Sequence, residues 1–229
     1  MACLDRNDLC RHLQTVPYFA GLDAAVLSEL AGVAARHEYA PGGVVFLEGE
    51  PSSGLYSIYS GWVKLIKLSP EGREHVLRYF GPGEVFSEMG GFLARPNPAT
   101  AVALEHSTLW HIPRLALQPV LVQHPGVLLQ VMANMADRIA YLAGMVADLS
   151  LYPLEVRLAR LLLEESRAGV LDRRAWLTQA ELAARMGTVP DVLGRTLRTL
   201  ADAGLIRVER RRIAILDRPG LAQRALLEE

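Results

Sequence analysis

The sequence has few cysteines and no long apolar run. Only two of its 229 residues are cysteine, Cys3 and Cys10, in a C-x6-C spacing. Two cysteines are too few for a four-cysteine iron–sulfur cluster, and the spacing is unlike a zinc C-x2-C knuckle, so both are predicted to be reduced thiols. No stretch approaches the roughly 18–20 uninterrupted apolar residues of a membrane span, and the N-terminus lacks a basic-then-apolar signal peptide. These absences predict a folded cytoplasmic protein without a membrane partner.

Charge is nearly balanced over the whole chain, with a net charge of −1, but it is unevenly distributed. Residues 185–212 hold seven arginines and three acidic residues, which gives this segment a net charge of +4. Such a segment indicates either a phosphate-facing surface or a solvated charged face, and charge alone does not decide between them. With 51% hydrophobic residues, the chain is long enough to form two modest domains.

The pattern of the N-terminal half changes near Pro41. Residues 8–36 space apolar residues by three and four, which predicts two short helices with Asp23 near a helix start. From about residue 40 to residue 113, short β-branched or aromatic runs alternate with turns such as Gly81-Pro82-Gly83. Many short strands at a spacing of roughly 8–12 residues predict an antiparallel barrel or jelly roll.

A long helix is predicted from Pro125 onward, over about residues 125–150. Its apolar positions step by four and three, with one skipped turn near Arg138 and Ile139. A stripe of this kind suits a partner helix, and the same helix of a second subunit would give a two-fold dimer. Packing of the stripe on the barrel of the same chain is the alternative. The predicted partner-facing residues are Val131, Met135, Leu142, Met145 and Leu149.

The C-terminal part predicts three helices and a strand pair, the pattern of a winged helix-turn-helix. Thr178 and Glu181 form a capping box for the second helix, and Gly187 provides the tight turn. Thr188 with Asp191 repeats the box before the third helix. The third helix carries Pro190 in its first turn, where the missing N–H costs little, and it ends at Gly204. Leu182 and Met186 of the second helix are expected on an inner face together with Val192, Leu197 and Leu200 of the third.

The third helix occupies the place of a recognition helix, whose N-terminal end enters the major groove of DNA. Arg195 is expected to contact a guanine edge or a phosphate, and arginines at the wing turn are expected to meet backbone phosphate. The alternative for Arg195 is a solvent-exposed helix arginine. The predicted DNA-binding residues are Thr178, Gln179, Thr188, Val189, Asp191, Arg195, Arg198, Arg210 and Arg211.

The order of these parts, together with three particular stretches, resembles the Crp/Fnr (cAMP receptor protein-like) family of bacterial transcription regulators. The stretches are GVVFLEGEPSSGLYSIYSGWVKL, GREHVLRYFGPGEVFSE and LTQAELAARMGTVPDVLGRTLRTLADAGLI. The resemblance covers nearly the full length. It implies an α+β chain with three parts: a double-stranded β-helix, or jelly roll, of the cyclic-nucleotide-binding type with N-terminal helices (residues 1–124), a dimerisation helix (125–150), and a winged helix-turn-helix (151–229).

In cyclic-AMP-binding members of the family, a glycine-glutamate loop and an arginine followed by serine or threonine hold the cyclic phosphate and ribose. Here Glu88 matches the ribose-binding glutamate, but Ser87 stands in place of the glycine, and Asn97-Pro98 replaces the arginine pair. Leu142 and Ala143 replace the adenine-binding threonine and serine. The predicted effector-pocket residues are Glu88, Met89, Gly90, Asn97, Pro98, Ala99, Thr100 and Leu142.

These replacements argue against cyclic AMP as the effector, because neither asparagine nor proline carries a charge to offset a phosphate. Arg95 is expected to lie on the loop outside the pocket. No cofactor is predicted; haem or another small effector stays open, although His75, His106 and His111 alternate with apolar residues and are expected to be surface or half-buried side chains.

The recognition helix also departs from the family's commonest motif, with Pro190, Asp191 and Gly194 at three of its four positions and Arg195 matching the last. The half-site sequence therefore does not follow from relatives. The resulting prediction is a homodimeric, sequence-specific transcription regulator on an inverted repeat of double-stranded DNA, with RNA polymerase as a further partner implied by the family. The alternatives are a sensor acting through a protein partner and a cupin-type metal enzyme. For the enzyme, His106 and His111 are expected on opposite faces of one strand, so it is not favoured.

Overall fold

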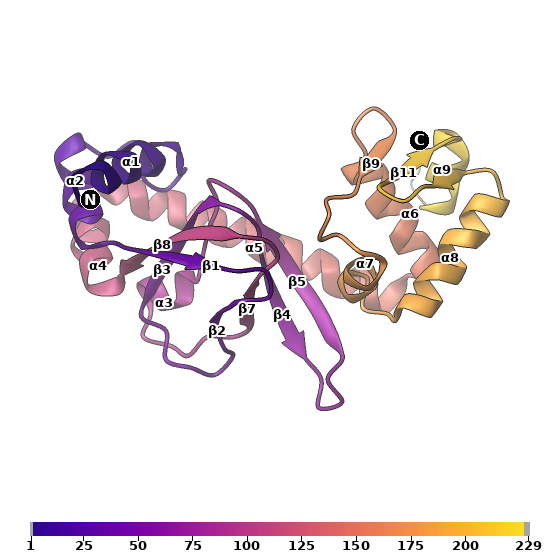
Figure 1. Ribbon diagram of the computed structural model, residues 1–229, viewed down its shortest axis with the longest axis horizontal. Helices are drawn as coiled ribbons and strands as arrows, with labels where there is room; N and C mark the ends of the chain where they lie inside the picture. The colour runs from indigo at the N-terminus through magenta and orange to yellow at the C-terminus, as the bar shows by residue number, and fades with distance from the viewer. Residues whose placement is uncertain (1, 227–229) are drawn as a thin grey trace. The chain divides into compact units, whose positions relative to one another are not determined.

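The computed structural model describes residues 2–226, and the chain divides into two compact units (Figure 1). Of the described residues, 2–67 and 77–139 form the first unit, and 68–76 and 140–226 form the second. Among the described side chains Cys10 is a free thiol, half-buried against the core of the first unit, whereas the side chain of Cys3 lies outside the described part.

The predicted jelly roll is confirmed as two four-stranded antiparallel sheets. One sheet has the strand order β1-β8-β3-β6 and the other has the order β2-β7-β4-β5. The strands of the first sheet are β1 (Ala35–Tyr39), β8 (Ser107–Pro113), β3 (Gly54–Ser60) and β6 (Val85–Phe86). Those of the second are β2 (Val44–Phe46), β7 (Thr100–Ala103), β4 (Val63–Leu68) and β5 (Glu74–Phe80).

The interior of the roll is filled mainly by aromatic and branched side chains. The ring centroid of Phe86 lies 6.0 Å from that of Phe46 and 5.4 Å from that of Phe80. Beside these rings pack Ile58 and Leu109, which have no exposed surface. The turns need glycine where the backbone is left-handed and crowded. At Gly61, with φ +87°, a Cβ would lie 2.6 Å from the Cα of Ser107.

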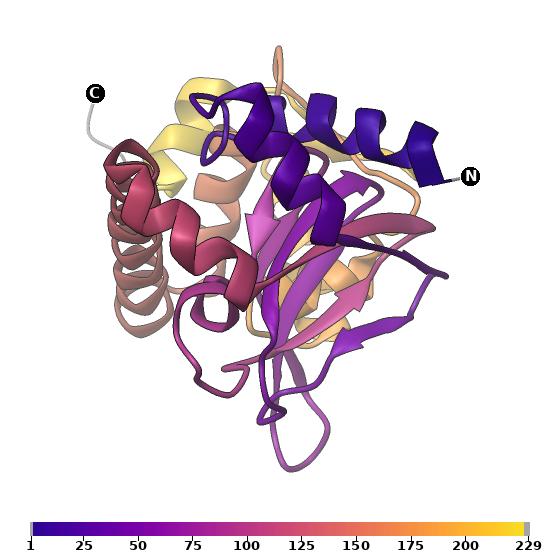
Figure 2. The same ribbon diagram turned by 90° about the vertical axis from the view of Figure 1, so that its left-hand side faces the viewer.

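Helices pack on the roll and extend its core. They are α1 (Ala2–Thr15), α2 (Ala24–Val33), α3 (Glu88–Phe92) and α4 (Arg114–Gln123). Figure 2 shows α1 and α2 lying across one end of the strands. His12 of α1 makes a 2.7 Å hydrogen bond through Nε2 to Ser57 Oγ of β3, and its burial lowers the pKa of the imidazole. Helix α4, which contains Pro119, was not expected from the sequence.

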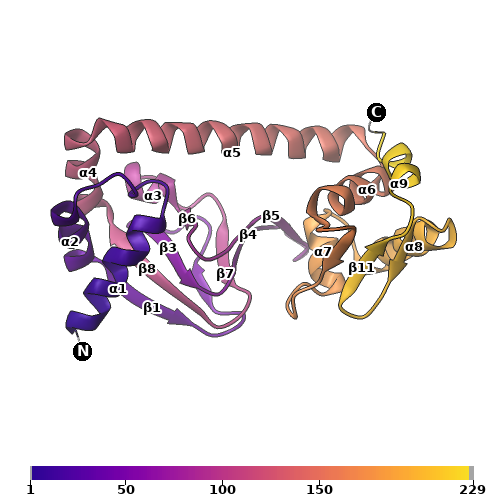
Figure 3. The same cartoon turned by 90° about the horizontal axis from the view of Figure 1, so that it is seen from above.

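The predicted long helix is α5 (Pro125–Leu151), one continuous helix of 27 residues (Figure 3). Within the described residues, no single helix is long and apolar enough to cross a membrane. Taken together, α4 and α5, which meet at a bend of 112°, are long and apolar enough by length and composition alone.

The second unit has the expected winged helix-turn-helix order, with one strand and one helix beyond the prediction. Its helices are α6 (Leu154–Glu165), α7 (Gln179–Arg185), α8 (Pro190–Asp202) and the additional α9 (Arg218–Arg224). Its sheet, in the order β10-β11-β9, joins β10 (Ile206–Val208), β11 (Arg212–Ile215) and the additional β9 (Val170–Asp172).

The cap predicted for the second helix of this unit is confirmed, but that for the third is wrong. Thr178 Oγ1 accepts a 3.1 Å hydrogen bond from the Glu181 N–H at the start of α7. Helix α8 instead begins at Pro190, with Val189 as its N-cap and no side-chain cap bond. Proline requires an extended residue before it, and Val189 has φ −106° and ψ 154°, so the helix start lies one residue later than a cap at Thr188 would place it.

The inner face of α8 also differs in one position. Leu193, Leu197 and Leu200 are buried, whereas Val192, which we expected inside, is only half-buried. Gly187 and Gly204 confirm their predicted turns with φ +62° and +74°.

Candidate DNA-binding surface and effector pocket

Helices α7 and α8 form the helix-turn-helix of the second unit. Their facing sides share one core, in which Leu182, Leu193 and Leu197 are at most 5% exposed. This packing leaves Asp191, Arg195 and Arg198 exposed on the outer face of α8. The structure therefore brings three of the predicted DNA-binding residues together on one helix face.

Four of the predicted DNA-binding residues are arginines without an acidic partner. Within the part of the chain that the structure describes, the guanidinium groups of Arg195, Arg198, Arg210 and Arg211 make no hydrogen bond or ion pair. By contrast, Arg185 pairs with Glu165. Unpaired arginines at the helix and at the β10–β11 turn suit phosphate or base contacts.

Gln179 has a structural role that limits its use for DNA. Its Nε2 donates a 3.0 Å hydrogen bond to the carbonyl of Pro190 and so ties α7 to the start of α8. A Cβ at Gly194 would lie 2.7 Å from the same nitrogen, so the glycine makes room for this tie. Thr178 is engaged as the cap of α7, Thr188 is half-buried, and Val189 is 44% exposed.

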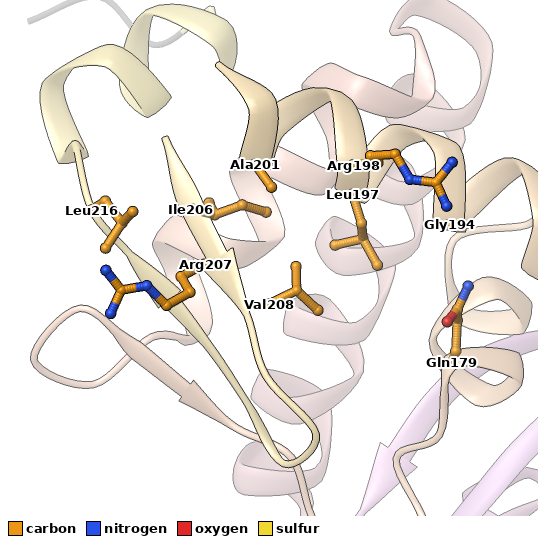
Figure 4. Close-up of a pocket in the computed structure, with 9 residues that line it drawn as sticks. All are labelled: Gln179, Gly194, Leu197, Arg198, Ala201, Ile206, Arg207, Val208 and Leu216. Atoms are coloured by element: carbon orange, nitrogen blue, oxygen red, sulfur yellow. The ribbon is translucent and has the colours of Figure 1, made fainter. Parts of the chain in front are cut away.

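A groove of about 560 Å³ runs between α8 and the wing strand β10 (Figure 4). Arg198 lies toward the end with Gly194 and Gln179, whereas Arg207 lies next to Leu216. The groove is lined by Gln179, Gly194, Leu197, Arg198, Ala201, Ile206, Arg207, Val208 and Leu216. It borders the exposed face of the predicted recognition helix.

The predicted effector pocket centres on Glu88, the first residue of α3, which is only 3% exposed. The residue before it, Ser87, has a left-handed backbone with φ +67°. Glycine adopts this conformation without strain, whereas serine does not. The Ser87 hydroxyl lies 3.2 Å from Ser52 Oγ, and a Cβ at Gly90 would overlap that same Ser52 hydroxyl.

Both carboxylate oxygens of Glu88 are engaged by side chains of the same chain. Arg138 of α5 donates through Nη1 to Oε2 at 2.5 Å, and the Tyr18 hydroxyl donates to Oε1 at 3.1 Å. Arg138 also donates through Nη2 to the Val85 carbonyl at 2.7 Å and lies 5.2 Å from the centre of the Phe80 ring. A tyrosine between α1 and α2, a glutamate of the roll and an arginine of the long helix thus meet at one buried point.

Burial dominates the electrostatics of this cluster. It raises the pKa of the Glu88 carboxyl, and the Arg138 guanidinium and the hydrogen bond from Tyr18 act in the opposite direction. Burial, and then the charge of Glu88, raise the pKa of the Tyr18 hydroxyl. Sequence reasoning missed Arg138 and Tyr18; the skipped turn of the apolar stripe at Arg138 was the signal for the first.

Most of the other predicted pocket residues belong to the roll, whereas Leu142 lies on α5. Asn97 is 5% exposed and donates through Nδ2 to the Leu47 carbonyl at 3.3 Å, and Thr100 Oγ1 accepts from the Glu48 N–H at 3.0 Å. Ala99 is buried, Met89 is half-buried, and Pro98 is exposed, as is Arg95 beside them. Leu142, by contrast, is 45% exposed on α5.

The apolar face that α5 leaves exposed differs from the face predicted from the sequence. Val131 is 6% exposed and belongs to the core of the first unit, so its placement toward a partner was wrong, and Met135 packs partly against that core. Met145 is half-buried. Among the exposed apolar residues of α5, which also include Leu129, Tyr141 and Leu151, six alternate by four and three around Met135: Leu128, Met132, Ile139, Leu142, Val146 and Leu149, each at least 40% exposed. We call these six residues and Met135 the α5 stripe.

The histidines considered for haem or metal are dispersed. His106 is exposed and lies before β8 rather than on it, while His75 and His111 are half-buried. The Nε2 of His111 lies 3.1 Å from Ser53 Oγ, and burial, together with His37, lowers the pKa of its imidazole. Among the side chains that the structure describes, no group of three or more histidines, cysteines, aspartates or glutamates could hold a metal ion.

Comparison with known proteins matches both units to described domains. The cyclic nucleotide-binding domain matches residues 36–124, and the Crp-like helix-turn-helix domain matches residues 156–224. The chain is 30% identical over 213 residues to the CRP-like cAMP-activated global transcriptional regulator of Mycobacterium tuberculosis, covering 90% of this chain and 95% of that protein. It is 31% identical over 206 residues to the cyclic AMP receptor protein of Thermus thermophilus, covering 88% and 95%.

Solved structures agree on the fold. The c-di-GMP responsive global regulator CLP of Xanthomonas campestris superposes with a TM-score of 0.73 at 24% identity, covering 85% of this chain and all of that chain. FixK2 from Bradyrhizobium japonicum gives a TM-score of 0.72 at 21% identity, covering 83% and 96%. At these identities the likeness shows the fold alone.

Replacing Tyr18 with phenylalanine tests the buried cluster. We expect Tyr18→Phe to lower the free energy of unfolding by about 1–3 kcal/mol, because it leaves one oxygen of a buried carboxylate without its donor. Chemical denaturation monitored by circular dichroism measures this. Tyr59→Phe is the matched control, since Tyr59 is 44% exposed, and it should change the value by less than about 0.5 kcal/mol. Equal effects of the two variants would contradict the role given to the Tyr18 hydroxyl.

Proposed function

The chain belongs to the Crp/Fnr family of transcription regulators, and from that premise we propose that it acts as a homodimer on an inverted-repeat DNA site. Its relatives are transcription regulators, which favours a regulatory rather than a catalytic role. The single observation that carries the proposal is the α5 stripe in a chain that also has an exposed basic recognition helix.

A second copy of the same helix is the partner that fits the α5 stripe. Apolar residues that alternate by four and three form the seam of a two-stranded coiled coil. A two-fold axis lets one surface serve both subunits, because each residue of the seam then meets the same seam on its partner. Such a patch of exposed apolar side chains is costly in water unless it is covered.

Two helix-turn-helix units related by that axis would present two α8 helices to two half-sites. In this arrangement half-site centres lie one turn apart, about 34 Å, and the site is an inverted repeat. Arg195 would donate to a guanine edge or a phosphate, and Asp191 would accept from cytosine within its shorter reach. The unpaired Arg210 and Arg211 would meet backbone phosphate, and RNA polymerase is the further partner that the family implies.

We propose further that cyclic AMP is not the effector. Asn97 and Pro98 supply no positive charge for a phosphate, and Arg138 is already paired with Glu88. Tyr18 takes the second oxygen of that carboxylate, so α5 is fastened to the roll by the chain's own side chains. The effector is then an apolar or planar ligand, haem included, or control lies in the amount of protein.

Placing a charge on the α5 stripe tests the homodimer. Ile139→Glu should convert the protein to a monomer at micromolar concentration and weaken binding to an inverted repeat at least about a hundredfold, since an unpaired carboxylate would be buried at the seam. Sedimentation equilibrium and fluorescence anisotropy measure the two effects. The control is Ala140→Glu, one residue along and outside the stripe, which should stay dimeric. A wild-type protein that sediments as a monomer would contradict the proposal.

Replacing Arg195 tests the recognition helix. Arg195→Ala should weaken binding to a selected site by roughly 1–3 kcal/mol through loss of a base or phosphate contact. The control is Arg218→Ala, an exposed arginine at the start of α9, which should bind as the parent does. An Arg195 variant that bound its site as tightly as the wild type would remove this residue from the DNA interface.

A further inference from the structure

The wing of the second unit ends in a two-residue tip flanked by opposite charges. Arg210 and Arg211 form the tip between β10 and β11, and the Glu209 N–H donates to the Arg212 carbonyl at 2.9 Å. The two residues that close the tip, Glu209 and Arg212, therefore face each other. The wing thus carries three consecutive arginines and, directly before them, one carboxylate.

Glu209 holds the third arginine through two contacts. Arg212 donates through Nε to Glu209 Oε2 at 2.6 Å and through Nη2 to Oε1 at 3.4 Å. The hydrogen bond from Arg212, its charge and that of Arg207 together lower the pKa of the Glu209 carboxyl, so it is ionised at neutral pH. Arg207 lies on β10, two residues before Glu209, and its charge also acts on the Glu209 carboxyl.

This arrangement has the chemistry of an arginine bound to a phosphate. A carboxylate that accepts from two guanidinium nitrogens presents the same charge and the same paired acceptors as a phosphate group. Both side chains are accessible, with Arg212 55% and Glu209 36% exposed, so Arg212 can exchange one anion for the other. In the same turn, Arg210 and Arg211 have no such anion and are already available.

We propose that Glu209 is an internal substitute for a DNA phosphate: it occupies Arg212 in the free protein and reduces the affinity of the wing for DNA backbone. This inference rests on the proposed DNA-binding function and deepens it. Binding DNA through Arg212 requires release of Glu209, which then lies beside the phosphates as an uncompensated negative charge. The carboxylate thereby weakens sequence-independent binding and leaves discrimination between sites to α8.

The opposite reading is that the pair only shapes the hairpin. Exposed ion pairs generally contribute little to stability, so loss of this pair should not unfold the wing. The two readings predict opposite changes in DNA affinity when Glu209 is neutralised. If Glu209 competes with phosphate, its neutralisation strengthens DNA binding; if it shapes the wing for DNA, its neutralisation weakens binding.

The chain offers a matched control for charge. Glu155 of α6 accepts from Arg224 of α9 at 2.8 Å, and these side chains are 31% and 52% exposed, close to the values for Glu209 and Arg212. Glu155 lies outside α7, α8 and the wing. Glu155→Gln therefore removes one negative charge and one exposed ion pair from the same unit without touching the proposed contact.

The test compares wild type, Glu209→Gln and Glu155→Gln as full-length proteins on a duplex of random sequence, by fluorescence anisotropy at several salt concentrations. We expect Glu209→Gln to bind roughly three- to tenfold more tightly and the slope of log affinity against log salt to steepen by about 0.9, the value for one added phosphate contact. Glu155→Gln should match the wild type. Arg212→Ala should bind more weakly than the wild type, because Glu209 remains without its partner.

Three results would overturn the inference. They are an unchanged or weaker affinity of Glu209→Gln, an unchanged salt slope, and an equal gain in Glu155→Gln, which would reduce the effect to net charge. In each of these cases the wild type still binds duplex DNA and the proposed function stands. A wild-type protein that bound no duplex at all would instead remove the proposed function, and this inference with it.

Discussion

The buried ion pair between Arg138 and Glu88 fixes the rotational phase of α5, and both proposed partners of the protein depend on that phase. Val127 and Val131 lie in the core of the first unit, and Arg138 is tied to the roll through Glu88 and Val85. The exposed Leu128, Met132 and Ile139 each follow one of these three by a single position. A helix turned by one residue would bury part of the stripe and leave a charged group in its place.

The same helix, α5, carries Arg138 of the Glu88 cluster and continues into the unit that holds the helix-turn-helix. The carboxylate that the family uses for a ligand is satisfied here by Tyr18 and Arg138, so the placement of α5 on the roll does not require a bound molecule. A seam set in this way determines the two-fold axis of a dimer, and that axis determines the spacing of two recognition helices.

Local signals predicted much of the fold. The glycine turns, the cap at Thr178 and the four–three spacing of α5 were read correctly because each depends on neighbours in the chain. Sequence reasoning failed where two local signals competed. At the start of α8, the proline at position 190 makes Val189 the N-cap in place of the predicted Thr188. Helix α4 was not predicted, and it contains a proline, Pro119. Which face of α5 meets the roll could not be read from the sequence, since the helix is apolar on two adjacent faces. The choice between them depends on residues far along the chain, among them Glu88, 50 positions from Arg138. Tyr18 was missed because its partner, Glu88, lies 70 positions away in the sequence.

Selection of bound duplexes from a random library by purified, ligand-free protein, repeated with added cyclic AMP, tests the central claim most directly. The account predicts an inverted repeat with half-site centres one turn apart, about 34 Å, recovered equally well with and without the nucleotide. Recovery of the repeat only with cyclic AMP would contradict the assignment of Tyr18 and Arg138 as the partners that replace a ligand at Glu88. Enrichment of no sequence, or of a single half-site, would contradict the homodimer on DNA itself.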